Sequence, residues 1–307
     1  MLLHLALAVA LAGMSAPVGV GGFDDAPHTM PRGWQPEQAD DMMAVLQQAA
    51  TLASDGQHEQ AANHYLWLWG NMLEKDPSMV GVRTSFMASE MQTLANRYPP
   101  ARSAFALLRS ELTADVGDDW QTTYDWVVLN EIVGEEERTV EWVREHADDP
   151  QARSVMGVAN DRIVAALIAH GEFPLLGRLY DDPIQEARED ARSLRHMCEL
   201  LRDDGEMLQF FRESYLDEIG TMYAALLAAE RGNEAAALLA AASVPRDDLP
   251  DERPAMVARA VEFGVAQAEH RALLDAAEGQ GANVATIRFD LEAALAARES
   301  GAPAAAR

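Results

Sequence analysis

Apolar residues recur with helical spacing along most of the chain, and the first clear example predicts a helix over residues 42–53. Its apolar positions fall at i, i+3, i+4, i+7, i+10 and i+11, which places them on one stripe. A second stripe starts after Gly56 and ends before Pro77, so a short turn joins two predicted helices. Helices joined in this way lie antiparallel and bury their stripes against each other. The two stripes consist of Met42, Val45, Leu46, Ala49, Leu52 and Ala53, and of Ala61, Tyr65, Leu68, Trp69 and Met72.

Similar glycine turns before apolar stripes return later in the chain, at intervals of roughly 25 to 40 residues, which is the period of stacked helix pairs. The glycines are Gly134, Gly171, Gly205 and Gly232. No segment shows alternating β-branched residues over four or more positions, so the pattern predicts no strand. We therefore expect an all-α fold.

The segment from Ala49 to Asp76 resembles a tetratricopeptide (TPR) repeat, with Gly56 at the turn, Ala61 five residues later and Tyr65 nine residues later. Gly232, Ala237 and Ala241 repeat part of the pattern. The other turns lack the alanine, so the array is degenerate and a generic helical-hairpin fold is the competing interpretation. The resemblance implies a right-handed solenoid-like array of antiparallel helix pairs whose inner surface binds peptides or proteins.

The predicted layout has five parts. Residues 1–22 form a signal peptide, 23–36 a Pro- and Gly-rich linker, 37–245 the degenerate helical-hairpin repeats, 246–299 a closing helix pair and 300–307 a frayed tail. An apolar run from Met1 to Ala12, too short to span a bilayer, supports the signal peptide, although no basic residue precedes it. We expect an exported protein, periplasmic or extracellular, if that segment is a signal peptide and a cytoplasmic one otherwise, with no integral membrane segment after signal cleavage.

Acidic residues outnumber basic ones strongly, with 50 Asp and Glu against 24 Lys and Arg and a formal net charge of -26. This balance argues against nucleic-acid binding, which depends on clustered basic residues. Lys75 is the single lysine and alanine is abundant. Codon bias in a GC-rich genome accounts for both features, and adaptation to a saline medium is the alternative.

Candidate catalytic and metal-binding groups in the sequence are each explained by structural roles. His58 and His64 lie six positions apart, whereas a zinc helix needs histidines at i and i+4, so we interpret them as solvent-facing. Cys198 falls on a core stripe with Leu194 and Met197 and is expected to be buried. Aspartate doublets stand at helix boundaries, where aspartate caps exposed backbone N–H groups. The doublets are Asp24-Asp25, Asp40-Asp41, Asp118-Asp119, Asp148-Asp149, Asp181-Asp182, Asp203-Asp204 and Asp247-Asp248. We expect no cofactor and no catalytic residue.

The function predicted from these patterns is a helical-repeat scaffold that binds a protein or peptide partner. An enzyme or accessory subunit with an unrecognised site is the alternative, and self-assembly through exposed tryptophans is a third possibility. Binding residues are expected on the side of each first helix that faces away from its partner helix. These candidates are Gln47, Gln48, Thr51 and Tyr223. Trp67 and Trp126 either pack against the next helix pair or lie exposed in the binding groove, and packing is the favoured interpretation.

Overall fold

The computed structural model describes residues 26–157, 160–202, 204–242 and 250–300 of the 307-residue chain. Regular structure within these ranges is helical and includes no strand; one isolated bridge joins Val116 and Asp119. The all-α prediction is therefore confirmed. The expected signal peptide and all but the first residue of the expected tail lie outside the described residues.

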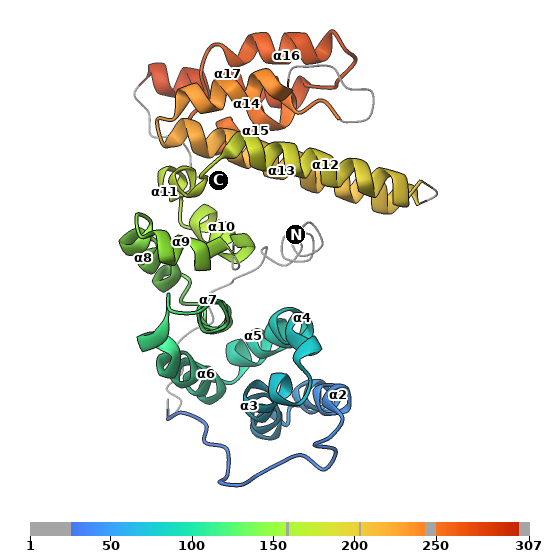
Figure 1. Ribbon diagram of the computed structural model, residues 1–307, viewed down its shortest axis with the longest axis vertical. Coiled ribbons are helices and arrows are strands. Elements are labelled where there is room, and N and C mark those ends of the chain that lie inside the picture. The colour runs from blue at the N-terminus through green and yellow to red at the C-terminus, as the bar shows by residue number, and fades with distance from the viewer. Residues whose placement is uncertain (1–25, 158–159, 203, 243–249, 301–307) are drawn as a thin grey trace. The chain divides into compact units, whose positions relative to one another are not determined.

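The chain divides into two compact units at residues 166 and 167, within α10. Figure 1 shows their helices in chain order. The described part of the N-terminal unit, residues 26–166, contains α2 Met42–Ser54, α3 His58–Lys75, η2 Pro77–Met79, α4 Val80–Val82, η3 Arg83–Met87, α5 Ala88–Arg97, α6 Pro99–Leu112, η4 Thr113–Asp115, α7 Trp120–Val133, α8 Glu137–His146, α9 Pro150–Met156 and the start of α10 Asn160–Ala169. The described part of the C-terminal unit, residues 167–300, contains the end of α10, α11 Phe173–Leu179, α12 Pro183–Leu200, α13 Gly205–Ala228, α14 Gly232–Ala242, α15 Arg253–Glu262, α16 His270–Glu278 and α17 Ala285–Glu299.

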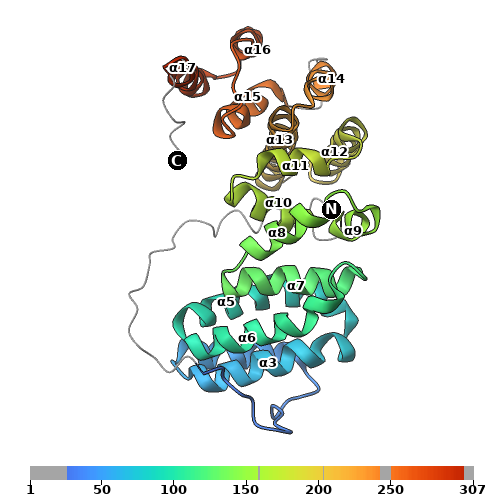
Figure 2. The same ribbon diagram turned by 90° about the vertical axis from the view of Figure 1, so that its left-hand side faces the viewer.

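The first helix pair forms as its apolar stripes predict. Gly56 ends the turn after α2 with a φ of 76°, a left-handed conformation that glycine adopts without a Cβ clash. The two helices then bury their predicted stripes in a core shared with α5, α6 and α7. Figure 2 shows α3, α6 and α7 lying alongside one another within this unit. The described part of the N-terminal unit thus contains a helical hairpin whose packing follows from nearby residues, namely the two apolar stripes and Gly56.

Aspartate doublets begin helices as predicted. The second aspartate of each of five doublets accepts a hydrogen bond from a backbone N–H in the first turn of the next helix, which satisfies a donor that has no partner within the helix. The five capping residues are Asp41, Asp119, Asp149, Asp182 and Asp204, at the starts of α2, α7, α9, α12 and α13. Asp24-Asp25 and Asp247-Asp248 lie outside the described residues.

Helix α13 is the central element of the C-terminal unit and packs against α11, α12, α14 and α15. Two glycines allow the closest of these approaches. A Cβ at Gly177 of α11 would stand 2.1 Å from the carbonyl oxygen of Ala225, and one at Gly220 of α13 would stand 2.8 Å from that of Ala255. Both positions therefore require glycine because the neighbouring backbone occupies the space of a side chain.

The structure corrects two predicted features of the C-terminal half. Gly205 and Gly232 are the first residues of α13 and α14 rather than left-handed turn residues, and Glu230 has the positive φ in the turn before α14. The expected closing helix pair is a group of three helices, α15, α16 and α17. Gly264, with a φ of 69°, follows the end of α15, so α16 forms as a separate helix.

Candidate interaction surface

Three of the predicted binding residues lie exposed on α2. Gln47, Gln48 and Thr51 face solvent, while the opposite side of the helix packs against α3. The hydroxyl of Thr51 donates to the carbonyl of Gln47 over 2.9 Å. Met43 was not among the predicted binding residues. It lies four residues before Gln47 and exposes 54% of its surface. Met43, Gln47 and Thr51 therefore follow one another at i, i+4 and i+8 on one face, together with Gln48 beside them.

The three aromatic candidates are buried. Trp67 lies in the core of the N-terminal unit, and Trp126 packs edge-on against Trp142 with its indole N–H donating to the hydroxyl of Thr113. Burial confirms the packing interpretation for both tryptophans. Tyr223 was expected to be exposed, and this was wrong. Residues 219–226 of α13 are all buried because neighbouring helices surround this part of the helix, so it has no free side.

The hydroxyl of Tyr223 instead joins α13 to α16. It lies 3.0 Å from Nε2 of His270, whose Nδ1 accepts a hydrogen bond from the backbone N–H of Gln267. A neutral imidazole that accepts at Nδ1 carries its proton on Nε2, so His270 donates to Tyr223. Burial lowers the pKa of His270 below its usual value, even though Glu269 opposes this shift. The pair is a neutral internal link between helices.

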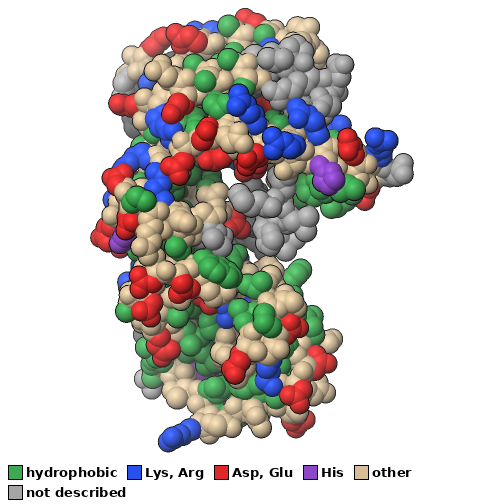
Figure 3. All heavy atoms as spheres, in the orientation of Figure 1, with side chains coloured by type: hydrophobic (Ala, Val, Ile, Leu, Met, Phe, Trp, Pro, Cys, Tyr) green, Lys and Arg blue, Asp and Glu red, His purple; other side chains and the backbone are tan. Residues whose placement is uncertain are grey.

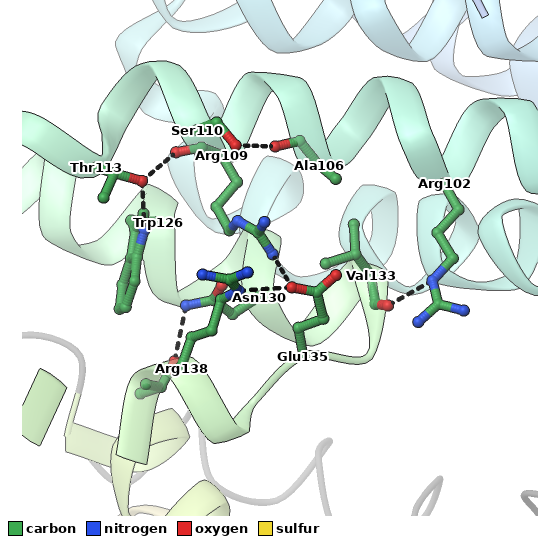
Figure 4. A network of polar contacts seen from close by, with 11 residues as sticks. Arg102, Ala106, Arg109, Ser110, Thr113, Trp126, Asn130, Val133, Glu135 and Arg138 are labelled. Carbon is green, nitrogen blue, oxygen red and sulfur yellow. Dashed lines mark hydrogen bonds and ion pairs between the residues drawn. The ribbon is translucent and has the colours of Figure 1, made fainter. Parts of the chain in front are cut away.

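Arginines in the N-terminal unit connect helices through carboxylates and carbonyl groups, as Figure 4 shows. Arg109 of α6 and Arg138 of α8 both donate to Glu135, over 2.7 and 2.6 Å. Burial acts to raise the pKa of Glu135, but hydrogen bonds and charge from Arg138 and Arg109 hold it below its usual range. Arg102 donates to the carbonyl of Val133, the last residue of α7, where a cation also complements the helix dipole. Each of these three arginines thus donates at least one hydrogen bond to an internal partner.

A second arginine contact is almost completely enclosed. Arg83 lies in the π-helical turn η3 and forms an ion pair with Asp125 of α7. Its guanidinium also donates to the carbonyl of Trp69 and stands 4.6 Å from the centre of the Trp69 ring. The amide of Gln121 donates to the same carboxylate, so the buried charges are hydrogen-bonded from several sides. At the next residue of η3, the carbonyl of Thr84 accepts from Arg162, which also pairs with Glu131.

Carboxyl groups without an arginine partner among the described residues are found on α12 and on α13, where burial and the charges of Asp190 and Glu186 raise the pKa of Glu218 to about 7. Burial and the charges of Asp190, Asp181 and Asp182 raise the pKa of Glu186 to about 7. Burial and the charge of Glu189 raise the pKa of Asp190 to about 6. These carboxyls hold protons nearer neutral pH than ordinary ones, which is the behaviour required of a general acid or base. Among the described residues, however, no group of three His, Cys, Asp or Glu side chains is arranged to hold a metal ion.

The expected exposure of His64 was wrong, and Cys198 is less buried than expected. His64 is buried rather than solvent-facing because Trp34, from the expected linker, packs edge-on against its ring at 4.9 Å. The same segment is anchored by His28, whose Nε2 lies 2.8 Å from the side-chain oxygen of Asn63. Cys198 is only partly buried, although Leu194 on the same stripe is fully buried.

Comparison with known proteins supplies no family for this chain. No protein-family model, curated protein or solved structure matches it. Within the described ranges, no helix has both the length and the hydropathy of a membrane span. Since no relative indicates a site, the candidate has to come from the structure of this chain, and we choose the exposed face of α2.

Proposed function

We propose that this protein is a helical scaffold that binds a peptide or protein partner, and that the exposed face of α2 is one of its contact surfaces. The observation that carries this proposal is the uncovered row of Met43, Gln47 and Thr51 on a helix whose opposite side is fixed against α3. The neighbouring Gln48 is also exposed. A surface that combines one flexible apolar side chain with amide groups suits recognition of a peptide.

The chemistry of this face supports binding rather than catalysis. Amide side chains of glutamine donate and accept hydrogen bonds but do not exchange protons near neutral pH. Methionine fits partners of different shapes because its unbranched side chain has three rotatable bonds. The hydroxyl of Thr51 is already held by the carbonyl of Gln47, which leaves its oxygen able to accept a further hydrogen bond.

A peptide-library selection on the immobilised full chain would test this proposal. Peptides that are recovered would be measured against the wild type and against a triple variant, Met43→Ser, Gln47→Ala and Thr51→Ala. We expect the triple variant to bind at least tenfold more weakly with an unchanged circular-dichroism spectrum, because only exposed side chains are altered.

The matched control uses an exposed apolar residue, a glutamine and a threonine elsewhere in the N-terminal unit: Leu107→Ser, Gln60→Ala and Thr93→Ala. Thr93 donates to the carbonyl four residues earlier, as Thr51 does. Equal binding by the wild type and the α2 variant, or equal loss in both variants, would contradict the proposed α2 surface.

The competing function is an enzyme, and the observation that favours it is the raised pKa of Glu186 and Asp190. A scaffold that uses α2 should keep its full affinity for selected peptides when Glu186 is replaced by glutamine, because no peptide contact involves that carboxyl. Loss of peptide binding in Glu186→Gln would favour a site on α12 and α13 instead.

A further inference from the structure

One helix of the C-terminal unit carries an unusual row of basic side chains. Arg188, Arg192 and Arg195 of α12 follow at i, i+4 and i+7, so helical geometry places them on one face over a length of about 10 Å. Arg202 follows in the turn between α12 and α13. Figure 3 shows arginine side chains along this hairpin. We call Arg188, Arg192 and Arg202 the arginine surface; each of the three is exposed.

The arginine surface lacks the internal partners that other arginines have. Within the described ranges, Arg188, Arg192 and Arg202 form no hydrogen bond or ion pair through their side chains, whereas Arg231 and Arg259 of the same unit bind carboxylates. Arginines four residues apart on a helix repel each other. Glu199 also falls on this face by its spacing, which leaves the face with a clear excess of positive charge.

Exposed apolar side chains lie at the end of the same hairpin. Leu200, the last residue of α12, exposes 64% of its surface, and Met207, in the first turn of α13, exposes 42%. Arg202 stands between them in the sequence. Unpaired cations beside exposed apolar groups form a surface of mixed chemistry, which is the composition that recognises a ligand with both acidic and apolar groups.

We infer that the α12–α13 hairpin binds a short acidic peptide segment, with its carboxylates on the arginine surface and an apolar side chain against Leu200 and Met207. Guanidinium groups pair with carboxylates through two parallel hydrogen bonds, so an arginine surface favours carboxylates on geometric grounds. This inference concerns a different face from α2 and goes beyond the proposed function, so either one can fail without the other.

The charge of the whole chain selects a short peptide over an extended anionic surface. A bilayer or a nucleic acid presents negative charge over tens of ångströms and would meet a chain with a net charge of -26. Screening limits such interactions to about 10 Å at moderate salt, so charges far from the hairpin act little on a ligand that covers the hairpin alone. A short acidic segment can pair with the arginines while it avoids most of the acidic surface elsewhere.

Fluorescence anisotropy with the full chain would test the inference. The probe is a labelled peptide of roughly fourteen residues with glutamates at i and i+4, matched to the spacing of Arg188 and Arg192, and a leucine near one end. We expect binding that weakens with added salt. The triple variant Arg188→Gln, Arg192→Gln and Arg202→Gln should weaken it at least tenfold, and Leu200→Ser with Met207→Ser should weaken it to a smaller extent.

Two controls make the result decisive. Arg32→Gln with Arg97→Gln removes exposed arginines of the N-terminal unit, which likewise have no ion-pair partner among the described residues, and should leave binding unchanged. A second peptide with glutamine in place of each glutamate should not bind. Equal binding of the two peptides, or equal loss in the two arginine variants, would overturn the inference. Stronger arginine-dependent binding to phosphatidylserine vesicles than to the acidic peptide would also overturn it.

Discussion

Arginines behave differently in two regions of the molecule, the helices around α7 and the α12–α13 hairpin. Around α7, Arg83, Arg109 and Arg162 each bind a carboxylate from another part of the chain. On α12, Arg188 and Arg192 face solvent without an ion-pair partner among the described residues. The first region uses arginine to join helices, whereas the second leaves its positive charge free for an anion from outside. Identical residue types thus join helices in one region, and in the other they form the surface for which we inferred a role in recognition.

Tryptophan fluorescence separates the two regions experimentally. All six tryptophans lie between residues 34 and 142, inside the N-terminal unit. Their fluorescence therefore reports unfolding of that unit, while far-ultraviolet circular dichroism reports helix loss in both units.

The largest effect is expected from Arg83→Gln, which breaks the enclosed ion pair and leaves the carboxylate of Asp125 buried without its cation. Removing one member of a buried pair costs about 3–5 kcal/mol. Stacking of the guanidinium on Trp69 is lost as well. Urea denaturation followed by tryptophan fluorescence should show the midpoint moving to much lower urea.

Arg97→Gln is the matched control, because Arg97 is exposed and has no ion-pair partner within the described residues. Its midpoint should stay close to that of the wild type. If both variants unfold at the same urea concentration, the arginine contacts around α7 do not stabilise the N-terminal unit and the comparison fails.

Local features of the fold could be predicted from the sequence. The pairing of α2 with α3 follows from apolar spacing and from Gly56, both of which act within a short stretch of chain. The aspartate caps follow from residues adjacent to the helices they begin. The exposure of Gln47 and Thr51 also follows from local spacing, because both lie on the side of α2 opposite the stripe that packs against α3.

Features that depend on distant partners could not be predicted. Asp125 lies 42 positions from Arg83, and no periodicity indicates which arginine will meet which carboxylate. Tyr223 was misplaced for a related reason: packing of several helices around α13 buries every side of that segment, so its amphipathic pattern is lost. The spacing of Arg188 and Arg192 was visible in the sequence, but only the structure shows that neither is paired.

A smaller, pH-dependent effect on stability is expected from Glu186→Gln, which removes a partly buried carboxyl group from α12. The pKa of Glu186 is raised from 4.5 to about 7, so the folded state binds more protons than the unfolded state between these pH values. Its contribution to stability is therefore fully present below pH 4.5 and is lost as the pH rises to about 7. Glutamine cannot ionise, so the variant should gain stability relative to the wild type as the pH rises through this window.

The gain should reach about 1–2 kcal/mol above pH 7, less than the full pKa shift implies, because water screens a partly exposed carboxyl. Circular dichroism during urea denaturation at pH 4.5 and pH 8 measures the difference, and the fluorescence transition should not move. Gln185→Ala, next to Glu186 in the same helix turn, is the control. A pH-independent difference between Glu186→Gln and the wild type would show that burial does not raise this pKa.

The smallest effect is expected from Arg188→Gln with Arg192→Gln, which makes the same chemical change as Arg83→Gln at exposed positions. No bond is lost, since neither side chain has a partner among the described residues, and removal of the repulsion between cations four residues apart contributes about 0.2–0.5 kcal/mol. Removing two positive charges from a chain of net charge -26 also increases the repulsion among its acidic groups, which destabilises the fold and opposes this gain. The free energy of unfolding, measured by circular dichroism in urea, should therefore change by less than about 0.5 kcal/mol in either direction. A loss comparable with that of Arg83→Gln would mean that these arginines stabilise the fold through contacts of their own, and a role in recognition would no longer be needed to explain their exposure.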